Sequence, residues 1–330
     1  ETNYQPGKRR DRVVLSFVQS LLPALRESAL AYYYINPEDL EAEAVIDLRI
    51  GAERAAEIRL GRARLLLRDV AAVLWRPPSW MMFTDTKRPE RTPAFATTVH
   101  RRRWSQFMRD LASFLPRETL WLPSHPLNGS QDWQNRLAEL ALARDVGLRV
   151  PETICTNDPE EGIAFLERAG GKAFYREWGI QPFLVDPSWV TTRDIARNRA
   201  QFARAPNVLM AYVPKAYEVR AVVVGDRVFA VRIDSQASPS PKAREDWREY
   251  DFTHVKWEPM RLPKTLETKV LRLMKLLDLR WGSFDLIKAT DGAFYFLEVN
   301  RPGAFAWLEP LVGLDVAKEV TSYLEREIAQ

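Results

Sequence analysis

The sequence contains little of what marks disulfide-rich, secreted or membrane proteins. Its single cysteine, Cys155, cannot form a disulfide within the chain, which agrees with a reducing compartment. No apolar run approaches the roughly 20 residues that span a bilayer, and the opening ETNYQPGKRR lacks the apolar centre of a signal peptide. We therefore expect a cytoplasmic protein with no membrane partner, in which Cys155 is a small buried side chain.

Glycine is also scarce, with 14 residues in 330, and no low-complexity or sustained charged tract is present. This composition excludes collagen-like and linker-rich chains. The hydrophobic content of 46% is enough for a substantial core divided over two or three lobes. The sequence therefore predicts an ordinary globular protein.

Charge gives only a weak signal for a polyanionic partner. The chain has 48 basic and 44 acidic residues, which gives a formal net charge of +4. The densest basic cluster, at residues 100–104, could meet phosphate or an acidic peptide, although a solvated helix face explains it more simply. The chain has 11 tryptophans, but no recognised nucleic-acid module accompanies them. We expect no nucleic-acid partner.

The first part of the chain alternates strand-like and helix-like segments, which is typical of an α/β lobe. The predicted strands lie at residues 13–17, 44–48 and 72–75, and the predicted helices at 20–30 and about 97–115. Prolines at positions 116, 123 and 126 then interrupt the pattern. The best boundary between lobes therefore falls within residues 120–129.

The rest of the chain combines helices with longer strands. Helices are predicted at residues 133–146, 159–169, 264–277 and about 316–328, and a short strand at 172–176. Two long strands, 218–224 and 228–233, are joined by Gly225-Asp226, which is a strong hairpin signal. The polar, proline-containing segment 235–251 is predicted to be a loop.

Polar side chains interrupt a predicted apolar hairpin at residues 283–300. Asp285 lies within an apolar run, while Glu298 and Asn300 are two residues apart and share one face of a strand. Magnesium is usually held by one or two carboxylates and completed by water and substrate phosphates. The pattern predicts a magnesium site for nucleotide chemistry.

Glu218 and Arg220 form a second alternating pair on a predicted strand. Both side chains can therefore reach one cleft. The residues alone also allow a surface cross-strand ion pair, so this alternative stays open.

The order of these motifs resembles that of the ATP-grasp ligases, and more narrowly that of the microviridin-type graspetide synthetases, which crosslink side chains of ribosomal precursor peptides by ester and amide bonds. The likeness covers nearly the whole chain. It is strongest in YVPKAYEVR at 212–220, VRIDSQ at 231–236, DWR at 246–248 and the hairpin, and weaker in VLWR at 73–76. It implies an α/β, ATP-grasp fold with an N-terminal pre-ATP-grasp domain (1–125), a small central lobe (126–208) and a C-terminal mixed-sheet lobe (209–330).

The resemblance also implies how ATP and Mg²⁺ are bound. Asp285, Glu298 and Asn300 would hold the metal against the ATP phosphates, and Glu218 would grip the ribose hydroxyls. The hinge against the adenine would be formed by Met210, Ala211, Tyr212 and Val213. By this resemblance, Arg136 and Arg176 stand in place of the family's two phosphate-contacting lysines, and Met210-Ala211 in place of the usual Gln-Glu of the hinge. Arginine is a planar fork rather than a point charge, so this exchange changes the geometry of the phosphate contacts.

The resemblance assigns the chemistry to three further residues. Arg220 would neutralise charge at the γ-phosphate and the acyl-phosphate. Arg248 would hold an acidic side chain of the core peptide, and Asp246 would orient Arg248 or accept a proton from the attacking group. Glu177 and Asp186 are possible contacts for the leader peptide.

The implied activity is ATP-dependent macrocyclisation of a ribosomal precursor peptide, with its leader and core, by a homodimeric enzyme. Two other interpretations stay open. The chain could be a ligase that adds a free amino acid to a carboxylate, which the DWR segment and Trp75-Arg76 argue against. It could also be a catalytically silent peptide-binding scaffold, which the arginine replacements and Ala211 favour and the three converging oxygen ligands disfavour.

Overall fold

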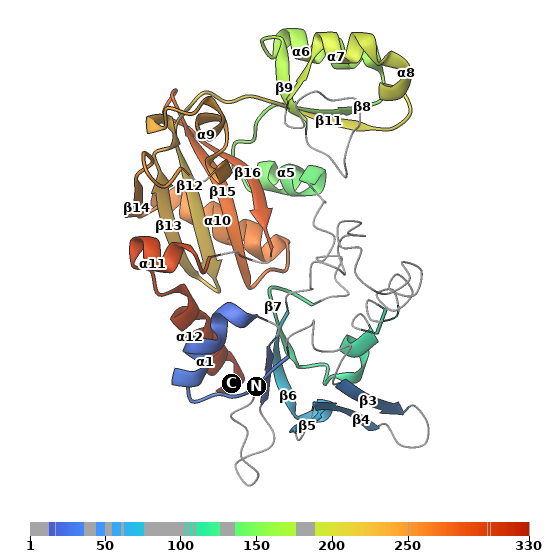
Figure 1. Cartoon of the computed structure of the whole chain (residues 1–330), viewed down its shortest axis with the longest axis vertical. Helices are drawn as coiled ribbons and strands as arrows, with labels where there is room; N and C mark the ends of the chain where they lie inside the picture. The colour runs from blue at the N-terminus through green and yellow to red at the C-terminus, as the bar shows by residue number, and fades with distance from the viewer. Residues whose placement is uncertain are drawn as a thin grey trace.

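The computed structural model describes residues 13–16, 18–35, 44–49, 55–60, 63–75, 103, 106–107, 110–125, 136–175, 189–249, 251–301, 303 and 305–329. These residues form a mixed α/β structure with four sheets, arranged along the long axis of the molecule (Figure 1). Arg76, Arg176, Glu177 and Asp186 lie outside the described residues, as does most of the basic cluster at 100–104.

Among the described residues, the first sheet is parallel and has the strand order β2-β1-β6-β7. Its strands are β1 (Val13–Ser16), β2 (Ala31–Tyr34), β6 (Val70–Leu74) and β7 (Leu120–Leu122). The strands predicted at 13–17 and 72–75 are confirmed as β1 and β6. Strands β2 and β7 are additional to the prediction.

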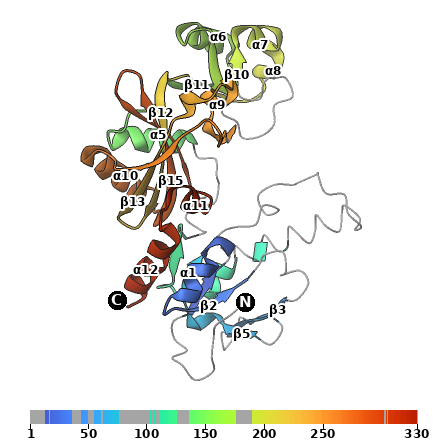
Figure 2. The ribbon, with the colours of Figure 1, turned by 60° about the vertical axis from the view of Figure 1, so that its left-hand side comes forward.

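The helix beside this sheet is shorter than predicted. A 3-10 turn (Gln19–Leu21) leads into α1 (Leu22–Glu27), which ends where Ser28 turns extended and its hydroxyl donates to the carbonyl of Leu25 at 2.9 Å. The prediction of a helix to residue 30 is wrong, because a serine hydroxyl competes for the last carbonyls. Leu25 packs in one core with the last helix, α12 (Val316–Ala329), and Figure 2 shows α1 and α12 side by side.

A small antiparallel sheet, ordered β3-β4-β5 in the described residues, follows the same part of the chain. It consists of β3 (Ala44–Arg49), β4 (Ala55–Leu60) and β5 (Ala63–Leu66). The strand predicted at 44–48 is confirmed. Ile58 and Leu65 pack with Val73 and Trp121 of the parallel sheet, so the two sheets share one core. Short 3-10 turns lie at Leu67–Asp69 and Ala112–Phe114.

A four-stranded antiparallel sheet, ordered β10-β9-β11-β8 in the described residues, stands at the other end of the molecule (Figure 1). Its strands are β8 (Thr153–Thr156), β9 (Lys172–Tyr175), β10 (Trp189–Thr191) and β11 (Asn207–Ala211). They are covered by α6 (Pro159–Arg168), α7 (Thr192–Arg197) and α8 (Arg199–Phe202). Cys155 on β8 is exposed, so the prediction of a buried cysteine is wrong: its strand position turns it away from the helices.

The site is built on a five-stranded antiparallel sheet, ordered β14-β13-β12-β15-β16 in the described residues. Its strands are β12 (Lys215–Val224), β13 (Arg227–Ile233), β14 (Trp257–Met260), β15 (Trp281–Ala289) and β16 (Phe294–Asn300). The predicted hairpin between β12 and β13 is confirmed, with Gly225 at a φ of +57°. Such a φ favours glycine because it has no Cβ.

Helices cover both faces of this sheet. On one face lie α5 (Arg136–Asp145) and α10 (Lys264–Leu276), whose predicted stripe packs into the core through Leu266, Val270, Leu273 and Met274. On the other face lie α11 (Leu308–Val312) and α12. The four predicted helices of this half are present as α5, α6, α10 and α12, apart from residues 133–135, which are not described, and α11 is additional to the prediction. No described helix combines the length and apolar character needed to cross a membrane.

The segment predicted to be a loop at 235–251 contains short helices instead. They are a 3-10 turn at Ser235–Ala237, α9 at Pro241–Glu245 and a second 3-10 turn at Trp247–Glu249. Helix α9 forms because the Ser240 hydroxyl accepts from the backbone N–H of Ala243, and Pro241 suits the first helical position. The DWR segment therefore begins directly at the end of a helix.

Candidate active site

Three adjacent strands bring the predicted site residues into one row. In the strand register, Arg220 of β12 lies opposite Asp285 of β15, and Asp285 lies opposite Glu298 of β16. Asn300 lies opposite Ser283, two residues along the same face. Residues opposite one another in an antiparallel sheet have Cβ atoms about 5 Å apart. The predicted grouping of Asp285, Glu298 and Asn300 on one face is therefore present.

A register shift makes this row possible. Leu286 lies opposite Phe296, whereas Asp285 lies opposite Glu298, so Leu297 is an extra residue on β16. An extra residue in one strand is a β-bulge, and such bulges re-aim side chains. Here the bulge turns Glu298 to the same face as Asp285.

Asp285 is buried and paired with a buried arginine. Its Oδ1 accepts from Nη1 of Arg220 at 2.9 Å. Burial raises the pKa of Asp285, and the charge of Glu298 adds to the rise, while Arg220 and Arg248 oppose it. The buried carboxylate of Asp285 therefore depends on nearby positive charge to offset the cost of its burial. Arg220 does not pair with Glu218, so the alternative of a surface ion pair between these two is wrong.

Glu298 is held by two arginines from different elements. Its Oε2 lies 3.0 Å from Nη1 of Arg136 on α5, and its Oε1 accepts from Nη1 of Arg248 at 2.9 Å. Arg248 is in turn clasped by Asp246, which accepts from Nε at 2.9 Å and from Nη2 at 2.8 Å. Burial alone would lower the pKa of Arg248, but the hydrogen bond to Asp246 and the charge of Glu298 outweigh it and keep that pKa above its ordinary value.

The donor set fits a magnesium ion. Within the described part of the chain no three His, Cys, Asp or Glu side chains gather as a metal site, so a cation here would depend on two carboxylates and an amide. The Oδ1 of Asn300 is buried and has no hydrogen-bond partner among the described residues. A buried carbonyl oxygen without a partner is costly. Together with Asp285 and Glu298 it offers the hard oxygen ligands that Mg²⁺ takes.

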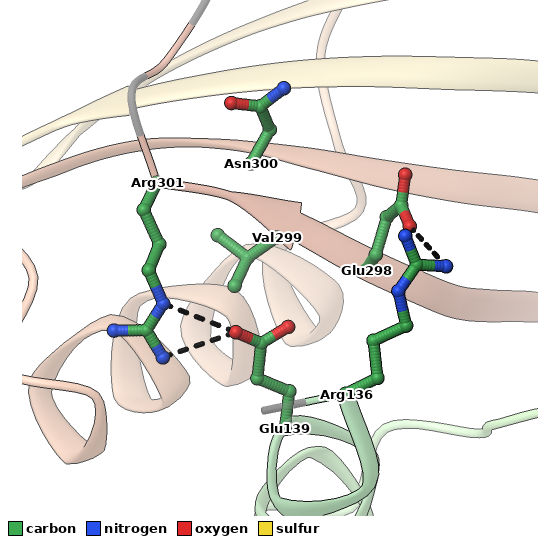
Figure 3. Close-up of a pocket in the computed structure, with 6 residues that line it drawn as sticks. All are labelled: Arg136, Glu139, Glu298, Val299, Asn300 and Arg301. Atoms are coloured by element: carbon green, nitrogen blue, oxygen red, sulfur yellow. Dashed lines mark hydrogen bonds and ion pairs between the residues drawn. The ribbon is translucent and has the colours of Figure 1, made fainter. Parts of the chain in front are cut away.

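A pocket opens beside these residues at the edge of the sheet. Its volume is about 70 Å³, and it is lined by Arg136, Glu139, Glu298, Val299, Asn300 and Arg301 (Figure 3). Figure 3 shows Arg136 reaching from α5 to Glu298, while Arg301 points from the end of β16 to Glu139. A basic side chain and oxygen ligands therefore meet in one pocket. Such a combination suits a phosphate group with its metal.

The predicted hinge runs from β11 to β12. Met210 is buried on β11, followed by the less buried Ala211, Tyr212 and Val213. Tyr212 lies near the ring of Trp189, with centroids 5.7 Å apart. Burial raises the pKa of Tyr212, and the carboxylates of Glu245 and Glu218 add to the rise. The hinge is thus lined by aromatic rings from the four-stranded sheet.

Glu218 is buried at the start of β12 and paired with a lysine that the sequence analysis did not single out. Lys215 Nζ lies 2.8 Å from Oε1 of Glu218 and donates to the carbonyl of Glu245 at 2.7 Å. Burial raises the pKa of Glu218, while Lys215 and a hydrogen bond with Ser235 oppose the rise. Spacing gave no signal, because residues three apart on a regular strand point to opposite faces. The register shift between Lys215 and Tyr217 lets the two side chains meet.

The pair of Glu139 and Arg301 was likewise missed. Its signals were modest: Glu139 follows Arg136 by three residues on a predicted helix, and Arg301 directly follows Asn300. Spacing of three residues places two side chains on one helix face. Nothing in the sequence could show that the two meet across 162 positions.

Comparison with known proteins agrees with this fold. No protein-family model matches the chain. It is 25% identical over 217 residues to "Probable alpha-L-glutamate ligase 2" of Shewanella denitrificans, an alignment that covers 62% of this chain and 68% of that protein. Macrocyclase MdnC of Microcystis aeruginosa, solved with precursor peptide MdnA, has a TM-score of 0.77 and 25% identity, covering 95% of this chain and 98% of MdnC.

The chain has the fold of the ATP-grasp ligases, and its relatives indicate an ATP-dependent ligase. A second solved structure, the RiPP-associated ATP-grasp ligase of Chryseobacterium gregarium with ADP, leader and core peptide, has the same fold, with a TM-score of 0.76 and 20% identity over 96% of this chain and 97% of the other. The predicted ATP-grasp fold and the resemblance to peptide macrocyclases are confirmed. The roles of the individual site residues stay predictions.

Proposed function

We propose that this ATP-grasp ligase is a peptide macrocyclase that joins side chains of a ribosomal precursor peptide by ester or amide bonds. The observation that carries the proposal is the match to MdnC, a macrocyclase bound to its precursor peptide, over 95% of the chain at 25% identity. The site supports it, because oxygen ligands, arginines and the DWR segment converge on one sheet edge.

ATP and Mg²⁺ would be received between the four-stranded and five-stranded sheets. PsnB, an ATP-grasp ligase of the same fold, has been solved with Mg, ADP and a minimal precursor, at a TM-score of 0.71. In this chain Asp285, Glu298 and Asn300 would hold the metal, which supplies charge neutralisation at the phosphates. Arg136 lies at the same pocket and would contact the phosphates. Arg176 would be a second phosphate contact.

The nucleoside would lie against the hinge. Met210, Ala211, Tyr212 and Val213 would line the base, and Glu218 would meet the ribose hydroxyls. Glu218 is held in place by Lys215 and Ser235, which leaves its position fixed before the nucleotide arrives. Preorganised groups lose little entropy on binding.

The chemistry would proceed in two balanced steps. A carboxylate oxygen of the peptide attacks the γ-phosphorus of ATP, the bond to the β-phosphate oxygen breaks, and an acyl-phosphate and ADP result. A hydroxyl or amine of the same peptide then attacks the acyl carbon, loses its proton, and inorganic phosphate leaves. Arg220 would neutralise the charge that gathers on the transferred group. Arg248, oriented by Asp246, would hold the peptide carboxylate through its guanidinium fork.

The proposal is tested by incubating the chain with ATP, Mg²⁺ and candidate precursor peptides that contain acidic and hydroxyl or amine side chains. The expected result is release of ADP together with loss of one water from the peptide for each crosslink. Asp285→Ala and Glu298→Ala should abolish both signals. A homodimer, a cytoplasmic location and leader contacts at Glu177 and Asp186 stay predictions.

The similarity to glutamate ligases favours a second candidate, addition of a free amino acid to a carboxylate. Mass spectrometry separates the two, because amino-acid addition raises the mass of the acceptor whereas macrocyclisation lowers it. Release of no ADP with any genuine precursor would instead indicate a silent peptide-binding scaffold.

A further inference from the structure

Two arginine–carboxylate pairs connect α5 to β16 in opposite directions. Arg136 of α5 meets Glu298 of β16, and Arg301, directly after β16, meets Glu139 of α5. The two pairs are the walls of the pocket in Figure 3. One pair includes candidate site residues; the other has no role in the proposed chemistry. This second pair needs its own explanation.

The pair of Glu139 and Arg301 is the more buried of the two. The side chain of Arg301 is 9% exposed and that of Glu139 4%, against 27% for Arg136. Both Nε and Nη2 of Arg301 donate to Oε1 of Glu139, at 3.2 and 3.1 Å. Removing both charges from water is costly, so such a pair is weak evidence for stability. Its best-attested use is to fix the register of two packed elements.

Adhesion between α5 and the sheet comes from apolar packing rather than from this pair. Leu140 and Ala143 of α5 lie in one buried core with Val299 of β16. Apolar contact is non-directional, so it holds the helix against the strand without fixing its rotation or its position along the strand. A hydrogen-bonded pair supplies that direction.

The pair of Glu139 and Arg301 connects the two elements that carry the candidate site residues, β16 and α5. Along β16, Glu298 and Asn300 point to one face of the sheet, and Val299 and Arg301 to the other (Figure 3). Arg301 therefore holds β16 from the face opposite the candidate metal ligands, directly after Asn300 in the chain. Glu139 lies one helical turn after Arg136, so the same turn of α5 carries the anchor and the phosphate-binding candidate.

We propose that Glu139 and Arg301 are positioning residues that hold Arg136 against Glu298, and so set the place where the nucleotide phosphates and the metal are received. The inference rests on the proposed function, since it needs a nucleotide at this pocket. In this proposal Glu139, which lines the same pocket, acts through Arg136 rather than by binding the phosphates itself. Burial raises the pKa of Glu139, and Arg301 opposes the rise.

The test is a binding cycle on the full chain, measured by calorimetry with a non-hydrolysable ATP analogue and Mg²⁺. Glu139→Gln keeps the shape of the side chain and removes its charge, and it should weaken binding about tenfold. In a chain that already carries Arg136→Met, the same change should alter affinity by less than about twofold, because the residue it acts through is gone. Arg301→Lys, which keeps the charge but loses the fork, should act in the same direction as Glu139→Gln.

Glu319→Gln is the matched control, since Glu319 pairs with the half-exposed Arg326 at 2.8 Å on α12, away from the pocket. It should leave affinity unchanged. Thermal unfolding of each variant distinguishes a loss of folding from a displaced Arg136 in a folded chain. If Glu139→Gln does not fold, Arg301→Lys takes its place in the binding cycle. Equal weakening by Glu139→Gln with and without Arg136, or no weakening at all, would overturn the positioning role. Failure of the unaltered chain to bind the analogue would overturn the proposed function as well, so the two failures are distinguishable.

Discussion

The guanidinium of Arg248 lies 2.9 Å from the carboxylate of Glu298, although 50 positions separate them in the chain. This contact joins the DWR segment, expected to recognise the peptide, to a strand expected to bind the metal. Arg136 contacts the other oxygen of Glu298, so one candidate ligand is compensated by two positive charges. A divalent cation would compete with both arginines for this carboxylate.

Arg248→Met should impair handling of the peptide more than binding of the nucleotide. The change removes a charged fork but keeps an apolar stem of similar length. Hydrogen bonds to charged groups contribute about 1.5–3 kcal/mol each, so kcat/KM for the peptide should fall by about tenfold to a hundredfold. Steady-state ADP release at varied peptide and varied ATP measures the two effects. A change confined to the KM for ATP would contradict the assignment.

Asp285→Ala should destabilise the fold as well as remove a metal ligand. It leaves Arg220 buried without its carboxylate, and breaking a buried ion pair by removing one partner costs about 3–5 kcal/mol. Glu319→Ala breaks an exposed pair and should cost less than about 1 kcal/mol. Urea unfolding of both variants without nucleotide gives the comparison. Equal losses would show that Arg220 does not depend on Asp285.

Lys215→Met should make stability depend on pH through Glu218. Burial raises the pKa of Glu218 above its ordinary 4.5, and Lys215 opposes this rise, so the variant raises that pKa further. The folded state then binds a proton that the unfolded state releases, and stability falls as pH increases through this interval. We expect this loss, up to about 3 kcal/mol, to grow as pH rises above 4.5. A loss that does not change with pH in urea unfolding would refute this.

Gly225→Ala should destabilise the β12–β13 hairpin more than Gly292→Ala destabilises the β15–β16 turn. Both glycines have positive φ, +57° and +84°, so each alanine meets backbone strain of about 1 kcal/mol. Only at Gly225 would the added Cβ also lie 2.7 Å from the ring of Tyr323, whereas Gly292 has open space. The difference between their unfolding free energies isolates the clash with α12. A larger loss at Gly292 would be inconsistent with this packing.

The C-terminal half of the fold was largely predictable because its signals are local. Gly225-Asp226 marks the hairpin, and the apolar stripe of α10 marks its buried face. Local patterns failed to predict helix ends at which a side-chain hydrogen bond determines the backbone conformation. Ser28 ends α1 early and Ser240 starts α9 inside a segment that polarity alone predicts to be a loop.

The candidate site was predictable only along single strands. Alternation on β16 correctly put Glu298 and Asn300 on one face. Which residues meet across strands and helices depends on register and packing, which one sequence does not encode locally. The contacts of Lys215 with Glu245, and of Arg301 with Glu139, are of this kind.

The additional residue at Leu297 has a consequence for anyone who shortens or transplants this hairpin. If pairing ran on regularly past Phe296, Leu297 would lie opposite Asp285 and Glu298 would turn toward the α10 side of the sheet. A chain of the same length in which the bulge did not form could keep every strand and still be unable to assemble a cation-binding centre. The bulge, rather than the acidic residue alone, is therefore the feature to preserve in engineering.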